Sequence, residues 1–326
     1  MTRLGAASTP VTPTSTPAGR EVSRSAGRPS RRSTRLELAL LLTPALVLFI
    51  GFVLLPIAVA IYYSFFKWTG FSPRTPFGLG NYRRVLEDEV FRGALLHNII
   101  IAVLSVAIQL PLSIGLALLL NRKMRGRRVL RLIVFAPYVL SEAVTAVVWL
   151  LMLQPGGFVD QILKAVGLGG LIQDWLADGR LVLYTLFVVV TWKYIGFGII
   201  LLLAGLQGIP AELREAAATD GASAWQTNRH IMLPLLGPTI RIWIFLSVIG
   251  SLQLFDLVWI MTLGGPANAS STMATYLLNH GFTRYEFGFG SAVAVVLFVV
   301  CFIFALIYQR FALRRDTAGA MTRFVR

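Results

Sequence analysis

Three ionisable side chains lie inside long apolar runs of the sequence: Glu142, Lys193 and Asp256. A charged group deep in hydrocarbon is costly, so it normally faces a cavity or a partner of opposite charge. The rise of a helix places Glu142 and Lys193 about 18 Å, and Asp256 about 10 Å, from one end of their predicted helices. Lys193 could therefore reach either acid. Two interpretations stay open, namely a buried ion pair that fixes helix packing and a set of contacts to a polar solute.

The run that contains Asp256 offers further groups for a polar solute. Gln253 and Asp256 are three residues apart and are predicted to share one face of a helix. Phe255 and Trp259 lie beside them, and sugars are held by hydrogen-bonding groups together with aromatic faces. These four residues, with Lys193 and Glu142, form the predicted substrate pathway. Simple packing of the two aromatic rings in an apolar helix is the alternative.

Other polar and small residues in the apolar runs are weaker candidates. Asn98 and Gln109 lie in the second run. Ser247, Gly250 and Ser251 are predicted on a different face of the fifth helix, where small side chains more commonly let a second helix approach closely.

Several kinds of catalytic site are excluded by the sequence. A phosphate-binding loop needs Gly-Lys-Ser/Thr, but the lysines follow Phe, Arg, Leu and Trp, so this chain is not itself an ATPase. A His-Glu-x-x-His metalloprotease site is excluded as well, because the histidines precede Asn, Ile and Gly. The single cysteine, Cys301, allows neither a disulfide framework nor a cysteine-based metal site. We therefore expect no catalytic residue, metal or cofactor in this chain.

The composition indicates that these side chains lie on transmembrane helices. The chain has 326 residues, of which 56% are hydrophobic and 14% charged, and its mean hydropathy is +0.71. Such a chain is an all-α integral membrane protein, which excludes a soluble enzyme and a secreted disulfide scaffold. Its net charge of +15 lies in tails and loops, so no nucleic-acid partner is predicted. Six transmembrane helices are expected near 38–66, 97–120, 130–153, 181–207, 238–263 and 288–310.

The distribution of basic residues predicts the orientation. Lys and Arg number 20 in the two tails and the loops 121–131 and 208–236, against eight in the other three loops. The positive-inside rule then places both termini in the cytoplasm. Residues 1–35 are predicted to be a disordered basic tail, residues 36–312 a six-helix transmembrane domain, and residues 313–326 a cytoplasmic C-terminal tail.

The loop 208–236 has signals for two short helices joined by a sharp turn. Pro210 suits the first turn of a helix, and Glu212 and Glu215 favour its amino end. Gly221 can adopt the left-handed conformation that ends a helix, and a second helix could run over residues 222–230. The loop is either a docking surface for a protein or an interfacial helix without a partner.

The same loop carries a family resemblance. The segments Glu215-Ala-Ala-Ala-Thr-Asp-Gly-Ala222 and Ile231-Met-Leu-Pro-Leu-Leu-Gly-Pro238 resemble the cytoplasmic "EAA" loop of binding-protein-dependent ABC importer permeases. Three further segments resemble the sugar permeases of the maltose and glycerol-phosphate type, and the first of their two permease subunits in particular. They are Phe135-Ala-Pro-Tyr138, Leu203-Ala-Gly-Leu-Gln-Gly-Ile-Pro210 and Phe255-Asp-Leu-Val-Trp-Ile-Met-Thr-Leu-Gly-Gly-Pro266. The sequence departs from the family at Glu142, often proline there, and at Leu263, often glycine.

The resemblance implies a type I ABC importer permease in the bacterial cytoplasmic membrane. Such a subunit pairs with a second homologous permease and with two copies of a cytoplasmic ATPase, which bind the ATP and Mg²⁺. An extracytoplasmic solute-binding protein delivers a sugar, expected to be an oligosaccharide, into an alternating-access pathway. By position, the ATPase-coupling residues would be Glu215, Ala216, Ala217, Asp220, Gly221 and Ala222. An ion-coupled secondary transporter, working through buried carboxylates, is the alternative.

Overall fold

The computed structural model describes residues 31–122 and 125–313, and these ranges are mostly helical. The chain divides into two units, Met1–Leu54 and Leu55–Arg326. In the first unit, α1 (Arg31–Phe49) continues into the π-helical segment η1 (Ile50–Leu54). The helix thus begins within the last residues of the predicted tail. The remainder of that tail, residues 1–30, and the C-terminal tail from residue 314 lie outside the described residues.

The second unit contains the other elements. Its first part consists of α2 (Leu55–Tyr63), the short antiparallel strands β1 (Phe66–Lys67) and β2 (Thr75–Pro76), α3 (Gly80–Glu87), α4 (Glu89–Leu104), the π-helical η2 (Ser105–Gln109) and α5 (Leu110–Asn121). Its middle part consists of α6 (Arg127–Val139), α7 (Glu142–Leu153), α8 (Phe158–Ala165), η3 (Gly169–Leu171) and α9 (Val182–Gln207). Next come α10 (Ala211–Thr219), α11 (Ala224–Thr227), η4 (Asn228–Met232), α12 (Leu233–Leu235), α13 (Gly237–Leu252) and α14 (Asp256–Thr262). The last are α15 (Met273–Leu278), η5 (Asn279–Thr283), α16 (Phe287–Tyr308) and η6 (Gln309–Leu313).

The predicted all-α membrane fold is confirmed. Within the described ranges, five helical segments are long and apolar enough to cross a bilayer, and a sixth crossing results if the bent pair α6 and α7 is one span. The five segments are Ala39–Tyr63, Glu89–Asn121, Val182–Gln207, Gly237–Thr262 and Phe287–Ala312. They coincide with five of the predicted spans to within a few residues at most ends, although the second begins well before residue 97.

The third predicted span, 130–153, is not one continuous helix. Its two halves, α6 and α7, meet at an angle of 98°. Leu140 and Ser141 are extended, and the hydroxyl of Ser141 accepts a hydrogen bond from the amide of Val144 at 3.2 Å. A serine cap starts a new helix, and Pro137 cannot donate to the helix before it. The sequence prediction was wrong here because the apolar run continues through the break.

The fifth predicted span is interrupted as well. The helix α13 ends at Leu252 and α14 begins at Asp256, so residues 253–255 are not helical. Gln253 and Asp256 therefore do not share one helix face, and that prediction was wrong. Their spacing of three residues has helical meaning only where the backbone is continuous.

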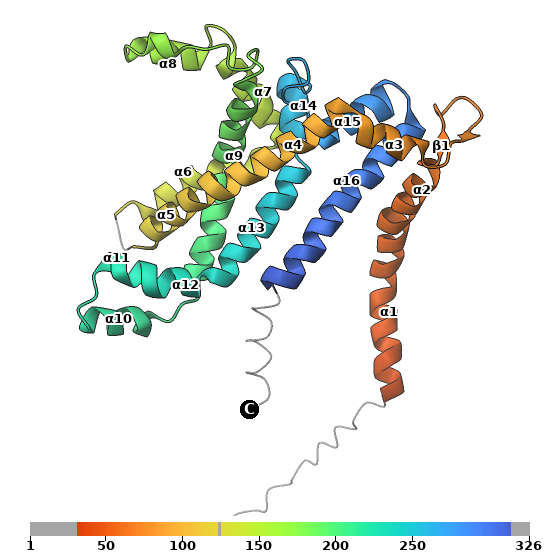
Figure 1. The fold of residues 1–326 in the computed structure, drawn as a ribbon. Helices are drawn as coiled ribbons and strands as arrows, with labels where there is room; N and C mark the ends of the chain where they lie inside the picture. Colours follow the sequence, from red (N-terminus) through yellow and green to blue (C-terminus); the bar gives the residue numbers. More distant parts are fainter. Residues whose placement is uncertain (1–30, 123–124, 314–326) are drawn as a thin grey trace, which may run out of the picture. The chain divides into compact units, whose positions relative to one another are not determined.

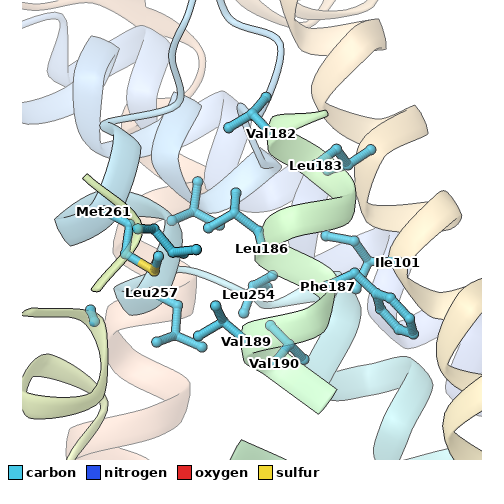
Figure 2. Close-up of a cluster of buried hydrophobic side chains, with 13 residues drawn as sticks. Ile101, Val182, Leu183, Leu186, Phe187, Val189, Val190, Leu254, Leu257 and Met261 are labelled. Carbon is cyan, nitrogen blue, oxygen red and sulfur yellow. The ribbon is translucent and has the colours of Figure 1, made fainter. Parts of the chain in front are cut away.

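The helix α9 lies at the centre of the second unit and supplies much of its core. Leu186 and Val189 are fully buried against Leu257 of α14, and Ile101 of α4 closes the cluster on another side (Figure 2). Gly196 lets α9 approach α6, because a Cβ atom there would lie 2.3 Å from the carbonyl oxygen of Val134. Close packing through small residues is a common basis of helix association in membranes.

The two ends of the second unit carry different short elements. The helices α10 and α11 lie at one end, and α8 and α14 lie at the other (Figure 1). The segments that connect the predicted spans therefore contain short helices of their own. This arrangement holds the segment 208–236 away from α8 and α14.

Candidate functional site

A cavity of about 330 Å³ lies where the two broken spans meet α4, η2 and α9. Its volume is at the lower end of the range for small-molecule sites, and polar and aromatic side chains line it together. The residues that line it are Ile101, Ser105, Gln109, Tyr138, Glu142, Val190, Tyr194, Phe197, Trp243, Leu246, Ser247, Gly250, Ser251, Gln253, Leu254, Phe255 and Asp256.

Two carboxyl groups meet at this cavity because both broken spans restart there. Glu142 is the first residue of α7 and Asp256 is the first residue of α14, and these helices pack together. The two carboxyl groups interact with each other, and the hydroxyl of Tyr194 donates a hydrogen bond to Glu142. Within the described ranges no group of three or more His, Cys, Asp or Glu side chains that could hold a metal ion forms.

Lys193 has a structural partner instead of a position in the cavity lining. Its side chain is 3% exposed, and its ammonium donates to the carbonyl of Leu140 at 2.6 Å. That carbonyl lies at the carboxyl end of α6, where the break removes helical hydrogen-bond partners and the helix dipole favours a cation. Lys193 thus stabilises the break that places Glu142 in the cavity.

Two buried polar side chains face the cavity without a partner. Ser105 is 1% and Gln109 is 3% exposed, and both belong to the π-helical η2. Neither side chain forms a hydrogen bond within the described part of the chain, and neither is among the fully buried atoms without a partner, so their polar atoms stay accessible from the cavity that they line. The sequence indicates Gln109 only as a weaker candidate and does not indicate Ser105. Short π-helical segments often occur at functional sites.

Asn98, the other weaker candidate, has a different place. Its amide donates to the carbonyl of Ser251 at 2.6 Å and accepts from the amide of Met273 at 2.9 Å. These bonds join α4 to α13 and α15. Asn98 is therefore a satisfied packing residue and does not line the cavity.

The aromatic side chains of the cavity come from several elements. Of the two predicted in the fifth span, Phe255 lines the cavity and Trp259 does not, although the two rings stack with centroids 5.9 Å apart. The sequence reasoning missed the other rings, since an aromatic residue in an apolar run gives no sign of the side it faces. These are Tyr138, Tyr194, Phe197 and Trp243.

The small residues of α13 do not all serve helix packing. Ser247 and Gly250 line the cavity, and a Cβ atom at Gly250 would meet no atom within 4 Å. Ser251 also lines the cavity while its carbonyl accepts from Asn98. Among residues 31–122 and 125–313, no second helix therefore approaches Gly250 closely, in contrast to the prediction.

The segment 208–236 forms two helices and a sharp turn, as the sequence predicts. Gly221 has φ +78°, and its amide donates to the carbonyl of Ala218 at 3.1 Å. The amide of Ala222 donates to Ala217 at 2.9 Å, which completes a Schellman motif at the end of α10. Ser223 and Gln226 then form a capping box that starts α11.

The surface of this segment is largely exposed. Of the six predicted coupling residues, Ala217 is buried and Ala222 half-buried, whereas Glu215, Ala216, Asp220 and Gly221 are exposed. Trp225 on α11 is 68% exposed, and the sequence reasoning did not single it out. The sequence does contain a sign that Trp225 could be a contact residue. This large aromatic residue follows a strong helix-start signal in a loop that is otherwise rich in alanine. Exposed tryptophans are common at the centres of protein interfaces.

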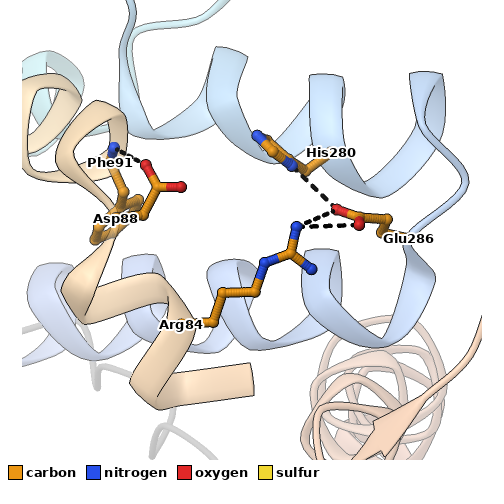
Figure 3. Close-up of polar contacts among 5 residues, drawn as sticks. All are labelled: Arg84, Asp88, Phe91, His280 and Glu286. Atoms are coloured by element: carbon orange, nitrogen blue, oxygen red, sulfur yellow. Dashed lines mark hydrogen bonds and ion pairs between the residues drawn. The ribbon is translucent and has the colours of Figure 1, made fainter. Parts of the chain in front are cut away.

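A second polar cluster joins α3 to the chain that leads into α16 (Figure 3). Arg84 donates to both carboxylate oxygens of Glu286, at 3.0 and 3.1 Å, and Nδ1 of His280 donates to the same carboxylate at 3.1 Å. Burial favours a raised pKa for Glu286, but the hydrogen bonds from His280 and Arg84 outweigh it, so the pKa is lowered. Burial lowers the pKa of His280 by more than Glu286 raises it. Asp88 lies nearby and caps α4 by accepting from the amide of Phe91 at 3.0 Å.

Comparison with known proteins gives consistent results over most of the chain. Residues 109–317 match the family described as the binding-protein-dependent transport system inner membrane component. A probable ABC transporter permease protein of Pyrococcus horikoshii is 35% identical over 282 residues, which cover 85% of this chain and 96% of the relative. The trehalose/maltose transport system permease protein of Thermococcus litoralis is 33% identical over 280 residues, covering 85% and 94% respectively.

A solved structure has the same fold. It is a bacterial alginate ABC transporter in complex with a periplasmic protein that holds an alginate pentasaccharide. The matched chain superposes with a TM-score of 0.76 at 22% identity, covering 86% of this chain and 96% of that one. The family match also removes the alternative of an ion-coupled secondary transporter. The chain belongs to the family of inner membrane components of binding-protein-dependent transport systems, and it is a permease of the ABC type.

Proposed function

We propose that this permease forms one half of an alternating-access pathway for a saccharide, and that the cavity between the broken spans is where the solute binds. The observation that carries the proposal is the cavity itself, whose lining combines aromatic rings with two buried polar side chains that lack partners, Ser105 and Gln109. Hydroxyl groups of a sugar can satisfy those side chains, and Tyr138, Tyr194 and Phe255 offer apolar faces. Similarity to a trehalose/maltose permease supports a saccharide as the solute.

Filling the cavity tests this proposal directly. Gly250→Leu places a side chain in open space at the cavity, so binding-protein-dependent uptake is expected to fall at least tenfold while assembly stays normal. Gly115→Leu is a matched control, because Gly115 is also helical, has open space at its Cβ position and does not line the cavity. Uptake by Gly250→Leu at the level of the Gly115→Leu control would reject the cavity as the solute site.

The second part of the proposal concerns energy coupling. The turn between α10 and α11 would dock on a separate cytoplasmic ATPase, two copies of which would bind the ATP and Mg²⁺. A second homologous permease would form the other half of the pathway, and both termini would lie in the cytoplasm. Support comes from the exposed Trp225, the fixed Schellman turn and the position of these helices at the end opposite α8.

Trp225 provides a sharp test of docking. Trp225→Ala removes a large exposed ring without touching the core, so the permease is expected to insert normally but lose at least tenfold in its affinity for the ATPase subunits. Trp225→Phe keeps an aromatic ring and should retain most of the binding. Co-purification of the ATPase with each variant at equal permease levels makes the measurement. Unchanged recovery with Trp225→Ala would contradict docking at this surface.

A further inference from the structure

The charges around the cavity bear on which saccharides it can admit. Glu142 and Asp256 both line it, and among the described residues that line it none is Lys, Arg or His. Lys193, which is not among the lining residues, donates its ammonium to the carbonyl of Leu140 and also interacts electrostatically with Glu142. One ammonium offsets at most one carboxylate, so the ionised pair leaves a net negative charge at the cavity.

The position of Glu142 at the start of α7 adds to the repulsion of anions. The amino end of a helix such as α7 attracts anions, because its free amide groups carry partial positive charge. In this chain Glu142 occupies the first position of α7 and places the protein's own carboxylate there. An anionic group of a solute would therefore meet a negative charge where a bare helix end would attract it.

We propose that the Glu142–Asp256 pair makes this cavity selective against anionic saccharides, so that the transported solute carries no carboxylate, phosphate or sulfonate group. The inference rests on the proposed function of the cavity. Gln109 and Ser105, which also line the cavity and form no hydrogen bond within the described part of the chain, can supply hydrogen bonds to uncharged hydroxyl groups. The carboxylates accept hydrogen bonds from hydroxyl groups and repel anions. Together these groups favour an uncharged polyol surface.

The potential of the cavity can be measured without knowing the solute. Gly250→Cys, in a Cys301→Ala background, places one thiol at the cavity of the assembled transporter. Its rates of reaction with the cationic trimethylammonioethyl and the anionic sulfonatoethyl methanethiosulfonates are compared, relative to the same ratio for free cysteine. We expect the cationic reagent to be favoured, and expect the ratio to fall about tenfold when Glu142→Gln and Asp256→Asn are added. The single Asp256→Asn variant, whose side chain is exposed, gives a smaller fall and serves if the double variant does not assemble.

The outcomes separate the two proposals. A rate ratio that the charge-neutralising changes leave unaltered would overturn the selectivity, and so would a cysteine that neither reagent modifies. An intact transporter whose ATP hydrolysis is stimulated by trigalacturonate and not by maltotriose would overturn it too. Failure of Gly250→Leu to reduce uptake would instead reject the cavity as the solute site, whatever the rate ratio.

Discussion

At the scale of single residues, the charged groups at the two broken spans have distinct tasks. Lys193 bonds to the carbonyl of Leu140, whereas Glu142 and Asp256 interact with each other at the cavity. The sequence offered Lys193 as a partner of either acid, and all three residues as parts of the pathway. The structure places only the two acids in the lining, while Lys193 donates to the carbonyl at the break between α6 and α7 and also interacts electrostatically with Glu142, one of the two acids that the sequence offers as its partner.

Replacing Lys193 should therefore affect stability. Lys193→Met keeps the length of the side chain but leaves the carbonyl of Leu140 without its donor, which we expect to cost roughly 1.5–3 kcal/mol. Thermal unfolding of the purified permease measures this loss, with the exposed Lys164→Met on α8 as a control. Adding Asp256→Asn should not restore the stability. Full rescue by that second change would show that the two side chains form a pair after all.

The polar cluster of Arg84, His280 and Glu286 predicts a pH dependence of stability. The folded pKa values of His280 and Glu286 lie below the ordinary values of 6.5 and 4.5, so the unfolded chain binds more protons as the pH falls. The free energy of unfolding is therefore expected to decrease from about pH 6.5 downward, through His280 first and Glu286 at lower pH. Above pH 7 the contribution of these two groups to the free energy of unfolding should be fully present.

Thermal unfolding at a series of pH values checks this prediction. In His280→Gln the decrease should begin at lower pH than in the parent, while His230→Gln on η4 should behave like the parent. A parental melting temperature that rises between pH 7 and pH 5 would contradict the assignment.

At the scale of elements, the turn after α10 is the clearest product of local sequence. Gly221 takes the left-handed conformation, and the capping box of Ser223 and Gln226 starts the next helix at once. At the end of α14, by contrast, a residue other than glycine takes the left-handed conformation. Leu263 has φ +53° there, at a position where the family often has glycine. A fold can hold a leucine in that conformation at the cost of some strain.

The turn at Gly221 gives a prediction for coupling. Gly221→Val puts a β-branched residue in the left-handed region, which costs about 1 kcal/mol or more and should displace α11. We expect transport and ATPase association to fall while membrane insertion stays normal. Gly221→Asn should retain more of both, because asparagine tolerates this conformation. Parental uptake by the valine variant would show that the turn has no part in docking.

At the scale of the whole molecule, the proposed topology predicts a labelling pattern. Single cysteines in the N-terminal tail, the loop 121–131 and the segment 208–236 should react only from the cytoplasmic side, and those in 154–180 and 264–286 only from outside. The excess of basic residues in the first set is the physical reason. Labelling of intact cells and of inverted vesicles with an impermeant reagent makes the measurement. One segment labelled from the wrong side would overturn the orientation and, with it, the docking proposal.

Four features can be predicted from the amino-acid sequence: the membrane class, the approximate positions of the spans, the turn at Gly221 and the family resemblance. Each of these depends on local patterns, namely the length of an apolar run, a capping signal or an ordered motif. The family model and the described helices agree with them.

The positions at which two spans break, and the side chains that those breaks bring together, depend on contacts between segments far apart in the chain. An apolar run reads the same whether its helix is continuous or bent, and Ser141 followed by Glu142 is a weak helix-start signal within it. The bent form persists because groups distant in the chain compensate the freed backbone, as Lys193 does for Leu140 across 53 residues. Tyr138, Gln109 and Gly250 lie on different elements and line one cavity, and no local pattern of the sequence encodes that arrangement.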